Sequence, residues 1–409
     1  MATTQKQWAS QLIPLLPANE NIQILDLSTA SASSIQNLHL ETPIILLNAD
    51  NPQILTQTLG FGLAAPCLII KPRQASSYEV YSLGKERIEI SDVSTQDVSQ
   101  DTGDENSAQT WQCDDTGNGD PLLFANQNVQ TQAQMIKTIL GAAPLDVVGA
   151  TPTLPLDQYR LLYVVLEHQW NLTDTQQTTN SLIMEVSLFA SYNPQYKYLR
   201  IRSMGAGFNP ASGKQMSSDD TYDRGYFQGA INMQMTPVSN RLTTLSTDPK
   251  NINGQTSYTS GSTFTVGVDI SKNPSFSPSY SVSESSTTVI SDFNVYNNSS
   301  GISAMWDFKY SRIEKDIWEM FSQPFMKKAQ VKTLPPLATR NLQPIADAVW
   351  YAPNSLMDNV GIRLSWHTDH YRCWVEGNWS NYTMYNHRKG MTVSHNENTF
   401  WVSFGWVNA

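Results

Sequence analysis

The stretch from residue 257 to residue 296 constrains the fold more than any other part of the chain, because its polarity alternates with a period of two. The apolar positions are Phe264, Val266, Val268 and Ile270 in a first arm and Phe276, Tyr280 and Val282 in a second. Small or polar residues stand between them, and a polar break at residues 272–275 separates the arms. Successive strand residues face opposite sides, so each arm has one apolar and one polar face. Two such arms around a turn predict a β-hairpin.

The alternation also predicts which residues of the two arms face each other. The expected pairs are Ile270 with Phe276, Val268 with Pro278, Val266 with Tyr280, and Phe264 with Val282. All of these residues then share one face of the hairpin. A transmembrane β-barrel strand has this pattern, with lipid on one side and water on the other. A surface hairpin that covers a β-sandwich has the same pattern, so both interpretations stay open at this point.

Several motifs resemble the leukocidin/hemolysin family of small β-barrel pore-forming toxins. The segments YTSGSTFTVG, PSFSPS and YSVSES, all within residues 258–285, resemble the pre-stem of that family. DIW at 316–318 with FMK at 325–327 is similar to the membrane-facing rim. LPPL at 334–337, followed by NLQP at 341–344, is similar to the segment that leads back from the rim. Since the segments also follow the order of the family, the resemblance covers roughly residues 151–408.

The resemblance implies a mainly β fold, namely a leukocidin-like β-sandwich with a rim and a pre-stem hairpin. It implies a secreted, soluble monomer that docks on a target membrane, assembles into a ring, typically of seven or eight subunits in the family, and inserts a β-barrel made from the stem hairpins. The expected partners are a lipid or glycan receptor of the target cell, and either further copies of the chain or a second toxin component.

The resemblance also gives individual residues expected roles. The membrane-inserting face of the stem would consist of Phe264, Val266, Val268, Ile270, Phe276, Tyr280 and Val282. The pore lumen would be lined by Thr265, Asp269, Ser271 and Ser281. Membrane contact at the rim would be made by Trp318, Phe321, Phe325, Lys327 and Lys328.

The residues favour no catalytic or nucleic-acid-binding function. A net charge of −10 argues against nucleic acid, because phosphate binding needs a basic surface. The chain has no Gly-x-Ser-x-Gly, HExxH or phosphate-loop motif, and His367 and His370 are three apart, so on a strand they face opposite sides. We therefore expect neither an enzyme nor a metal or cofactor. An alternative function remains: a non-inserting β-rich carbohydrate- or receptor-binding module, or the partner subunit of a two-component toxin.

The composition of the chain divides it into three parts. Residues 1–91 predict a small α/β N-terminal domain with a pro- or regulatory role, as in vibrio-type cytolysins of the family. Its short apolar runs at 22–25, 43–47 and 67–70 predict strands, and residues 78–90 predict a hairpin. Residues 92–150 predict an acidic linker, without Lys or Arg up to residue 120, followed by a helix over 127–140. Residues 151–409 predict the pore-forming domain, with the pre-stem at about 256–290 and the rim at about 311–345.

Two residue types carry further expectations. Eight of the eleven tryptophans follow Ser303, and we expect those in alternating strands to be ordinary core residues. These are Trp306, Trp350, Trp366 and Trp401. The three cysteines are too few for a disulfide framework, although Cys67 and Cys113 could pair in an oxidising compartment.

Overall fold

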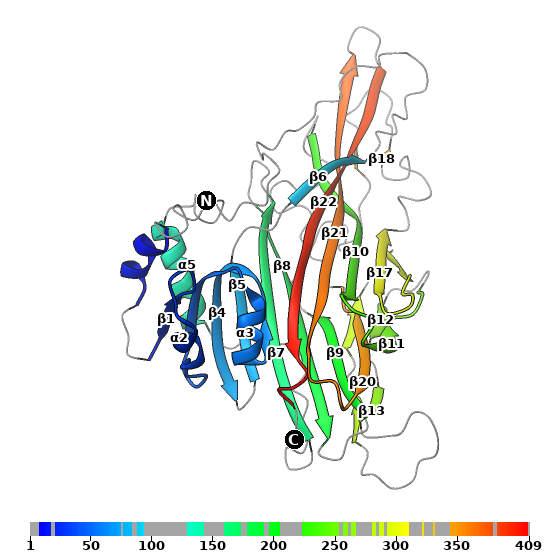
Figure 1. Ribbon diagram of the computed structural model, residues 1–409. Coiled ribbons are helices and arrows are strands. Elements are labelled where there is room, and N and C mark those ends of the chain that lie inside the picture. The colour runs from blue at the N-terminus through cyan, green and yellow to red at the C-terminus, as the bar shows by residue number, and fades with distance from the viewer. Residues whose placement is uncertain are drawn as a thin grey trace, which may run out of the picture.

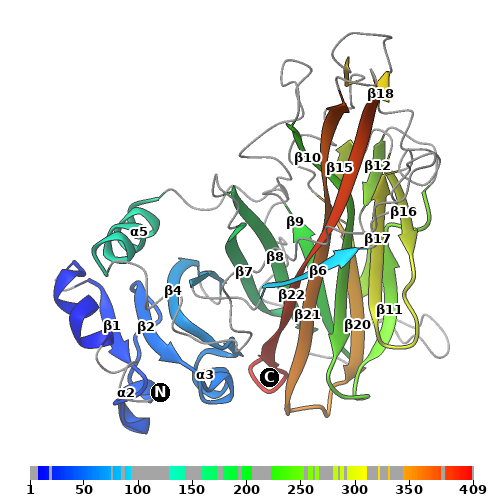
Figure 2. The same cartoon turned by 90° about the horizontal axis from the view of Figure 1, so that it is seen from above.

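The computed structural model describes residues 8–17, 21–74, 77–83, 88–93, 129–142, 159–172, 178–191, 196–204, 223–252, 257–260, 263–266, 280–283, 286–289, 293–310, 321–322, 330–331, 344–378 and 383–407. Two large β-sheets make up most of these residues. Helices lie beside one of the sheets, at the end formed by the N-terminal strands (Figures 1 and 2). The expected mainly β fold class is therefore confirmed. Among the described helices, none is long and apolar enough to cross a membrane.

Nine strands form the larger sheet, here called sheet A, in the order β1-β2-β4-β5-β7-β8-β9-β20-β11. The strands are β1 (Gln23–Asp26), β2 (Ile44–Ala49), β4 (Ala65–Gln74), β5 (Ser77–Leu83), β7 (Tyr159–Leu172), β8 (Thr178–Ser191), β9 (Tyr196–Met204), β20 (Asp347–Pro353) and β11 (Thr243–Asp248). Neighbours are antiparallel except for the pairs β1–β2 and β5–β7, which are parallel. Strands from the N-terminal and C-terminal parts of the chain thus belong to one sheet.

Seven strands form the second sheet, sheet B. They are β16 (Phe293–Asn297), β17 (Ala304–Tyr310), β10 (Asp223–Pro237), β21 (Asn359–Asn378), β22 (Thr383–Ser403), β3 (Phe61–Gly62) and β6 (Ile88–Val93). The order is β16-β17-β10-β21-β22-β3, and β6 pairs with β22 further along that strand. The long β21–β22 pair extends beyond the rest of the sandwich (Figure 1).

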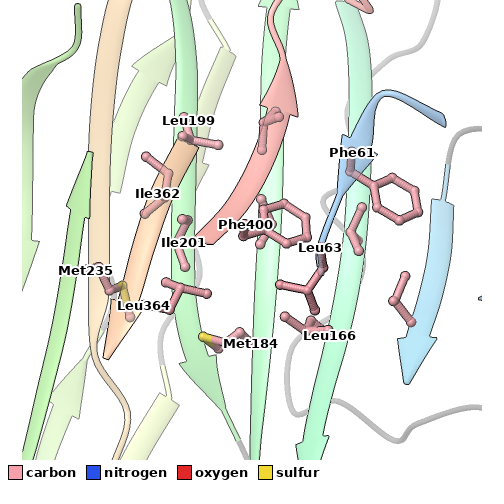
Figure 3. Close-up of a cluster of buried hydrophobic side chains, with 14 of the residues drawn as sticks. Phe61, Leu63, Leu166, Met184, Leu199, Ile201, Met235, Ile362, Leu364 and Phe400 are labelled. Atoms are coloured by element: carbon pink, nitrogen blue, oxygen red, sulfur yellow. The ribbon is translucent and has the colours of Figure 1, made fainter. Parts of the chain in front are cut away.

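The sandwich core lies between the facing sides of the two sheets. Leu199 and Ile201 of sheet A, for example, pack in one cluster with Ile362, Leu364 and Phe400 of sheet B (Figure 3). Alternate residues of these strands enter the core, as the period of two requires. Three of the tryptophans predicted to be core residues are buried, namely Trp306, Trp350 and Trp366, whereas Trp401 is half-buried. The prediction is confirmed for those three.

Helices cover the other side of sheet A at its N-terminal end. Strand β2 is buried on both sides, because Ile44 and Leu46 enter the sandwich core while Ile45 and Leu47 enter a second core. Helix α5 (Val129–Gly141) closes this second core together with the helical residues 8–12 and the 3-10 turn η1 (Ile13–Leu15). The predicted helix over 127–140 is confirmed for its described residues, which begin at Val129.

Two short helices complete the N-terminal unit. They are α2 (Ala32–Gln36) and α3 (Pro52–Leu59). Helix α3 begins at Asn51, whose side chain accepts a hydrogen bond from the Gln53 N–H, and ends at Gly60, whose φ of 82° is left-handed. The next two residues form β3, which pairs with β22. The chain therefore passes from sheet A to sheet B at the end of α3.

The structure corrects three expectations for the N-terminal half. Residues 78–90 do not form a hairpin, because β5 pairs with β4 and β7 while β6 pairs with β22. Strand β6 runs to Val93, so it includes the first two residues of the segment predicted as an acidic linker. Cys67 is a buried free thiol, so it does not pair with Cys113, which lies outside the described residues. Each of these outcomes depends on contacts between segments far apart in the sequence.

A fourth correction concerns the C-terminal strands. The sequence predicts separate strands over 360–366 and 371–379, but β21 is one continuous strand of 20 residues. Residues 399–403 of the predicted final strand over 399–406 are the end of β22, which begins at Thr383 and ends at Ser403. Continuous pairing between the two strands over most of their length joins these segments.

Candidate functional site: a hairpin on the outer face of sheet A

Two short ladders occupy the predicted hairpin. Strand β12 (Ser257–Ser260) pairs with β15 (Ser286–Val289), and β13 (Thr263–Val266) pairs with β14 (Tyr280–Ser283). Both ladders have the same register, centred on Asn273, so the second continues the first without an inserted residue. They therefore belong to one antiparallel hairpin that spans residues 257–289.

The register confirms two of the predicted backbone pairs. Phe264 pairs with Val282, and Val266 pairs with Tyr280. The other two predicted pairs, Ile270 with Phe276 and Val268 with Pro278, lie outside the described residues. Neither ladder pairs with a strand of sheet A or sheet B. Within the described part of the chain, the hairpin is thus a separate two-stranded element.

The base of the hairpin is attached to the sandwich core. Ile252 and Val295 exchange two backbone hydrogen bonds of 2.8 Å, and Val295 is completely buried. Asn297 donates from Nδ2 to the carbonyl oxygen of Pro249 at 2.8 Å, and its own N–H donates to Asn251 Oδ1 at 2.6 Å. Trp306 Nε1 donates to the same Pro249 carbonyl at 3.2 Å. The segments that enter and leave the hairpin are therefore held together by the core.

The hairpin lies against strands β8 and β9. Strand β13 lies close to both of them. Strand β8 is hydrogen-bonded to β7 and β9, and β9 to β8 and β20, so neither has a free edge. Their inner sides pack on sheet B in the sandwich core. The side that remains for the hairpin is the outer face of sheet A.

This outer face carries charged side chains that are almost inaccessible to water. Glu185 of β8, Arg202 of β9 and Asp347 of β20 are successive partners across the three strands. Arg200, two residues before Arg202, donates from Nε and a terminal nitrogen to Asp347 Oδ2 at 2.9 and 2.5 Å. The four side chains are 4%, 0%, 0% and 2% exposed. We call them the charged row.

Hydrogen bonding from the same face supports the charged row. Arg202 Nη1 lies 3.9 Å from Glu185 Oε2, and the Tyr163 hydroxyl donates to Glu185 Oε1. The neighbours Leu199 and Ile201 point into the sandwich core, so Arg200 and Arg202 face the opposite way. Burying charges is unfavourable unless they are paired and hydrogen-bonded. The pairing within the row offsets part of that desolvation cost.

The outer face of sheet B differs in both composition and exposure. It presents Asn232, Gln234 and Asp307, which are half-buried, and Arg363, which is exposed. This is the ordinary arrangement of a sandwich with one wet side on each sheet. Sheet A has a comparably polar outer face, but there the charged row is covered. Among the described residues, burial of the outer charged side chains distinguishes sheet A from sheet B.

The structure gives backbone positions for only some of the predicted site residues. Phe264, Thr265, Val266, Tyr280, Ser281 and Val282 lie in the β13–β14 ladder. Phe321 lies in β18 (Phe321–Ser322), which pairs with β19 (Gln330–Val331). The remaining predicted residues lie outside the described parts of the chain: Val268, Asp269, Ile270, Ser271, Phe276, Trp318, Phe325, Lys327 and Lys328.

Sequence reasoning missed the charged row. The local signal is the segment YLRIRS at residues 198–203, in which apolar and basic residues alternate. Such alternation predicts a strand with one wet side, and nothing in it indicates that the wet side is covered. The partners Glu185 and Asp347 are 17 and 145 residues away from Arg202 in the sequence, so only the sheet order brings the row together.

The fold and the hairpin define a class of protein: a two-sheet β-sandwich that carries a separate hairpin on the covered outer face of one sheet. No protein-family model matches the chain, and no curated protein matches its sequence.

Solved structures of pore-forming proteins are similar to part of the chain. One described as a pore-forming protein is 12% identical, with 60% of this chain and 94% of that chain covered at a TM-score of 0.42. The delta-toxin of Clostridium perfringens is 14% identical, with 65% and 97% covered at a TM-score of 0.44. The NetB toxin of Clostridium perfringens, in its membrane-inserted form, is 12% identical, with 61% and 98% covered at a TM-score of 0.36.

Proposed function

We propose that this protein is a secreted pore-forming cytolysin. In this proposal the hairpin over residues 257–289 leaves the outer face of sheet A after the protein has docked on a target membrane. Several copies assemble into a ring, and their hairpins together form one β-barrel through the bilayer. Residues of the rim segment, namely Trp318, Phe321, Phe325, Lys327 and Lys328, make the first contact with the membrane.

The observation that carries the proposal is the independence of the hairpin. Its two described ladders share one register, neither pairs with a strand of either large sheet, and the segments at its base are held together. Such an element can move away without breaking the strand pairing of the sandwich. The register also pairs Phe264 with Val282 and Val266 with Tyr280, so an apolar face and a polar face follow from the alternation. These are the two faces that lipid and a water-filled lumen require.

Backbone hydrogen bonding sets the order of events. A lone hairpin in lipid leaves the N–H and C=O groups of both edges unsatisfied, at a cost of several kcal/mol for each group. Closure of a ring pairs every edge with a neighbouring hairpin and removes that cost. Assembly of the ring must therefore precede full insertion.

The test is the release of calcein from lipid vesicles, with two matched variants at adjacent positions of β13. Val266→Arg places a charge on the proposed lipid face, where a mid-bilayer Arg costs about 2–4 kcal/mol per subunit. We expect this variant to lose dye release. Thr265→Arg places the same charge in the proposed lumen, so we expect release to persist and the channel to become more anion-selective. Equal loss in both variants, or no release by the wild-type protein on any receptor-containing vesicle, would exclude the proposal.

We further propose that the N-terminal unit has its regulatory role while it remains attached. Its strands β5, β3 and β6 pair directly with β7 and β22 of the sandwich, which supports an integral unit over a removable one. Residues 94–128 contain one glutamate, Glu105, so a glutamyl endopeptidase has a single expected site there. After this cut, the two fragments should co-elute in native gel filtration and separate only in denaturant. Separation without denaturant would instead support a removable pro-region.

A further inference from the structure

We propose that Met357 is an oxidation site, and that its sulfoxide strengthens the contact between the turn that joins the two sheets and the C-terminal turn. Met357 lies between β20 of sheet A and β21 of sheet B, and it is 46% exposed, so a peroxide dissolved in water can reach its side chain. Among the methionines whose side chains the structure describes, the others are buried or half-buried. The inference does not depend on pore formation.

The partner of the Met357 sulfur is a buried lysine ammonium. Lys197 of β9 is 0% exposed, and its Nζ donates to the carbonyl oxygens of Leu356 at 2.9 Å and Phe404 at 2.7 Å. Its third contact is the Met357 sulfur at 3.7 Å. The three N–H groups of this ammonium therefore have two good acceptors and one thioether, which is only a weak acceptor.

No carboxylate among the described residues compensates the charge of this ammonium. Asp358, which follows Met357 in the chain, pairs instead with Arg241 at the surface. Burial accordingly lowers the pKa of Lys197 from its usual 10.5. A buried charge without an opposite charge is stabilised by its hydrogen-bond acceptors, so a stronger third acceptor should stabilise the folded protein.

Backbone contacts hold Met357 beside the ammonium. The Phe404 N–H donates to the carbonyl oxygen of Asp358 at 3.2 Å. Gly405 lies so close that a Cβ at this position would be 3.0 Å from the Met357 carbonyl oxygen. The turn between the two sheets is thus packed on the C-terminal turn that follows β22, and Met357 cannot move away from Lys197 without disturbing these contacts.

Oxidation by a hydroperoxide, such as hydrogen peroxide, converts the weak acceptor into a strong one. The sulfur lone pair attacks one peroxide oxygen, and the O–O bond breaks as the S–O bond forms. The hydroxide that results takes the proton left on the transferred oxygen and leaves as water, so the sulfur is oxidised by two electrons and the peroxide is reduced by two. An oxygen on a sulfur that lies 3.7 Å from Nζ can reach about 2.8 Å from that nitrogen, the usual length of a charge-assisted hydrogen bond.

The expected sign is the opposite of the usual effect of methionine oxidation. A sulfoxide normally destabilises a protein because it places a polar group in an apolar core. Met357 is partly in water already, and its sulfur contacts a charged donor. The added oxygen therefore gains a hydrogen bond to a charge in the folded state.

The experiment treats the full-length protein with hydrogen peroxide, locates the sulfoxides by peptide mapping and measures the Tm by calorimetry. Met357→Leu is the matched control, because it keeps every other methionine and lacks only this sulfur. We expect Met357 to be oxidised while the buried Met184, Met233 and Met235 stay reduced. Relative to its effect on Met357→Leu, peroxide should raise the Tm of the wild-type protein by about 2 °C, as expected for one hydrogen bond to a charged group.

Two further variants test whether the ammonium causes the effect. In Lys197→Leu the sulfoxide has no charged donor, so the gain in Tm should disappear. Met357→Gln carries an amide oxygen in the place of the sulfoxide oxygen, so without peroxide its Tm should exceed that of Met357→Leu by a similar amount. This second reading is available even if Lys197→Leu does not fold.

Four results would overturn the proposal. The first is a Met357 that stays reduced in peroxide, and the second is an oxidised Met357 without the gain in Tm. The third is an equal gain in Lys197→Leu, which would show that the ammonium is not the partner. The fourth is a Met357→Gln protein that is no more stable than Met357→Leu.

Discussion

Replacement of Phe61 by alanine should destabilise the sandwich although Phe61 belongs to the N-terminal unit. Phe61 is 2% exposed, and it stacks on Phe400 of sheet B with ring centroids 6.2 Å apart and ring planes 5° apart. Its centroid also lies 5.5 Å from that of Tyr78 in sheet A. One side chain thus contacts both sheets at the junction between the N-terminal unit and the sandwich (Figure 3). If the two parts unfold together, loss of this side chain should lower the unfolding temperature of both.

The expected magnitude follows from the burial of the ring. A fully buried Phe→Ala replacement costs about 3–5 kcal/mol, which combines lost transfer free energy with the cavity that remains. The unfolding entropy at about 2.1 cal/mol/K per residue is roughly 0.86 kcal/mol/K for 409 residues. A loss of about 4 kcal/mol should therefore lower the Tm by about 5 °C.

The assay follows thermal unfolding by calorimetry and by tryptophan fluorescence, which is dominated by the C-terminal part of the chain because eight of the eleven tryptophans follow Ser303. Both signals should shift together in Phe61→Ala. Ile54→Ala on the neighbouring helix α3 is the control, because Ile54 is 41% exposed and its replacement should change stability by no more than about 0.5 kcal/mol. A lower calorimetric transition with an unchanged tryptophan transition would show that the N-terminal unit unfolds independently, and would refute the reasoning.

Three further predictions concern single side chains. Gly62→Ala should strongly destabilise the protein, because the new Cβ would lie 2.0 Å from the Pro52 carbonyl oxygen. Gly141→Ala, whose new Cβ would have no atom within 4 Å, should be nearly neutral. Chemical denaturation measures the free energy of unfolding of both variants. Burial raises the pKa of the Cys67 thiol to about 12, so it should resist alkylation in the native protein near neutral pH and react only in denaturant, as peptide mapping can show. Burial lowers the pKa of Lys197, so between that lowered pKa and the usual 10.5 the unfolded chain binds more protons than the folded one. In this pH range the free energy of unfolding of the wild-type protein, measured in urea, should rise with pH relative to that of Lys197→Met. A difference between the two proteins that stays constant with pH would contradict this.

The sequence was sufficient wherever the signal was local and periodic. The alternation over residues 264–282 predicted the hairpin and two of its backbone pairs, because the register of an antiparallel pair follows from where the apolar residues fall on each side of the turn. The stripe of Val129, Ala133 and Ile136 likewise predicted α5. Short apolar runs bounded by turn residues predicted β1, β2 and β4.

The sequence was insufficient to predict which strands pair when the two strands lie far apart along the chain. Strands β5 and β6 look like a hairpin because each alternates and Gly84 stands between them, yet β5 joins β7 and β6 joins β22. Pairing of that kind is decided by which edges are available and by which apolar surfaces are buried together. Neither quantity is a property of the two segments themselves.

The amino-acid order by itself determined that this protein is mainly β, where most of its strands run and that one hairpin has two unlike faces, since those features depend on neighbours one to four residues away. Only the tertiary structure decided that the N-terminal strands join the sandwich, and that Glu185, Arg200, Arg202 and Asp347 lie together and are buried. The physical reason is that burial is a property of the assembled sheets: the same alternation of apolar and charged residues occurs in a strand with one water-exposed side and in a strand buried on both sides, and only the packing distinguishes them.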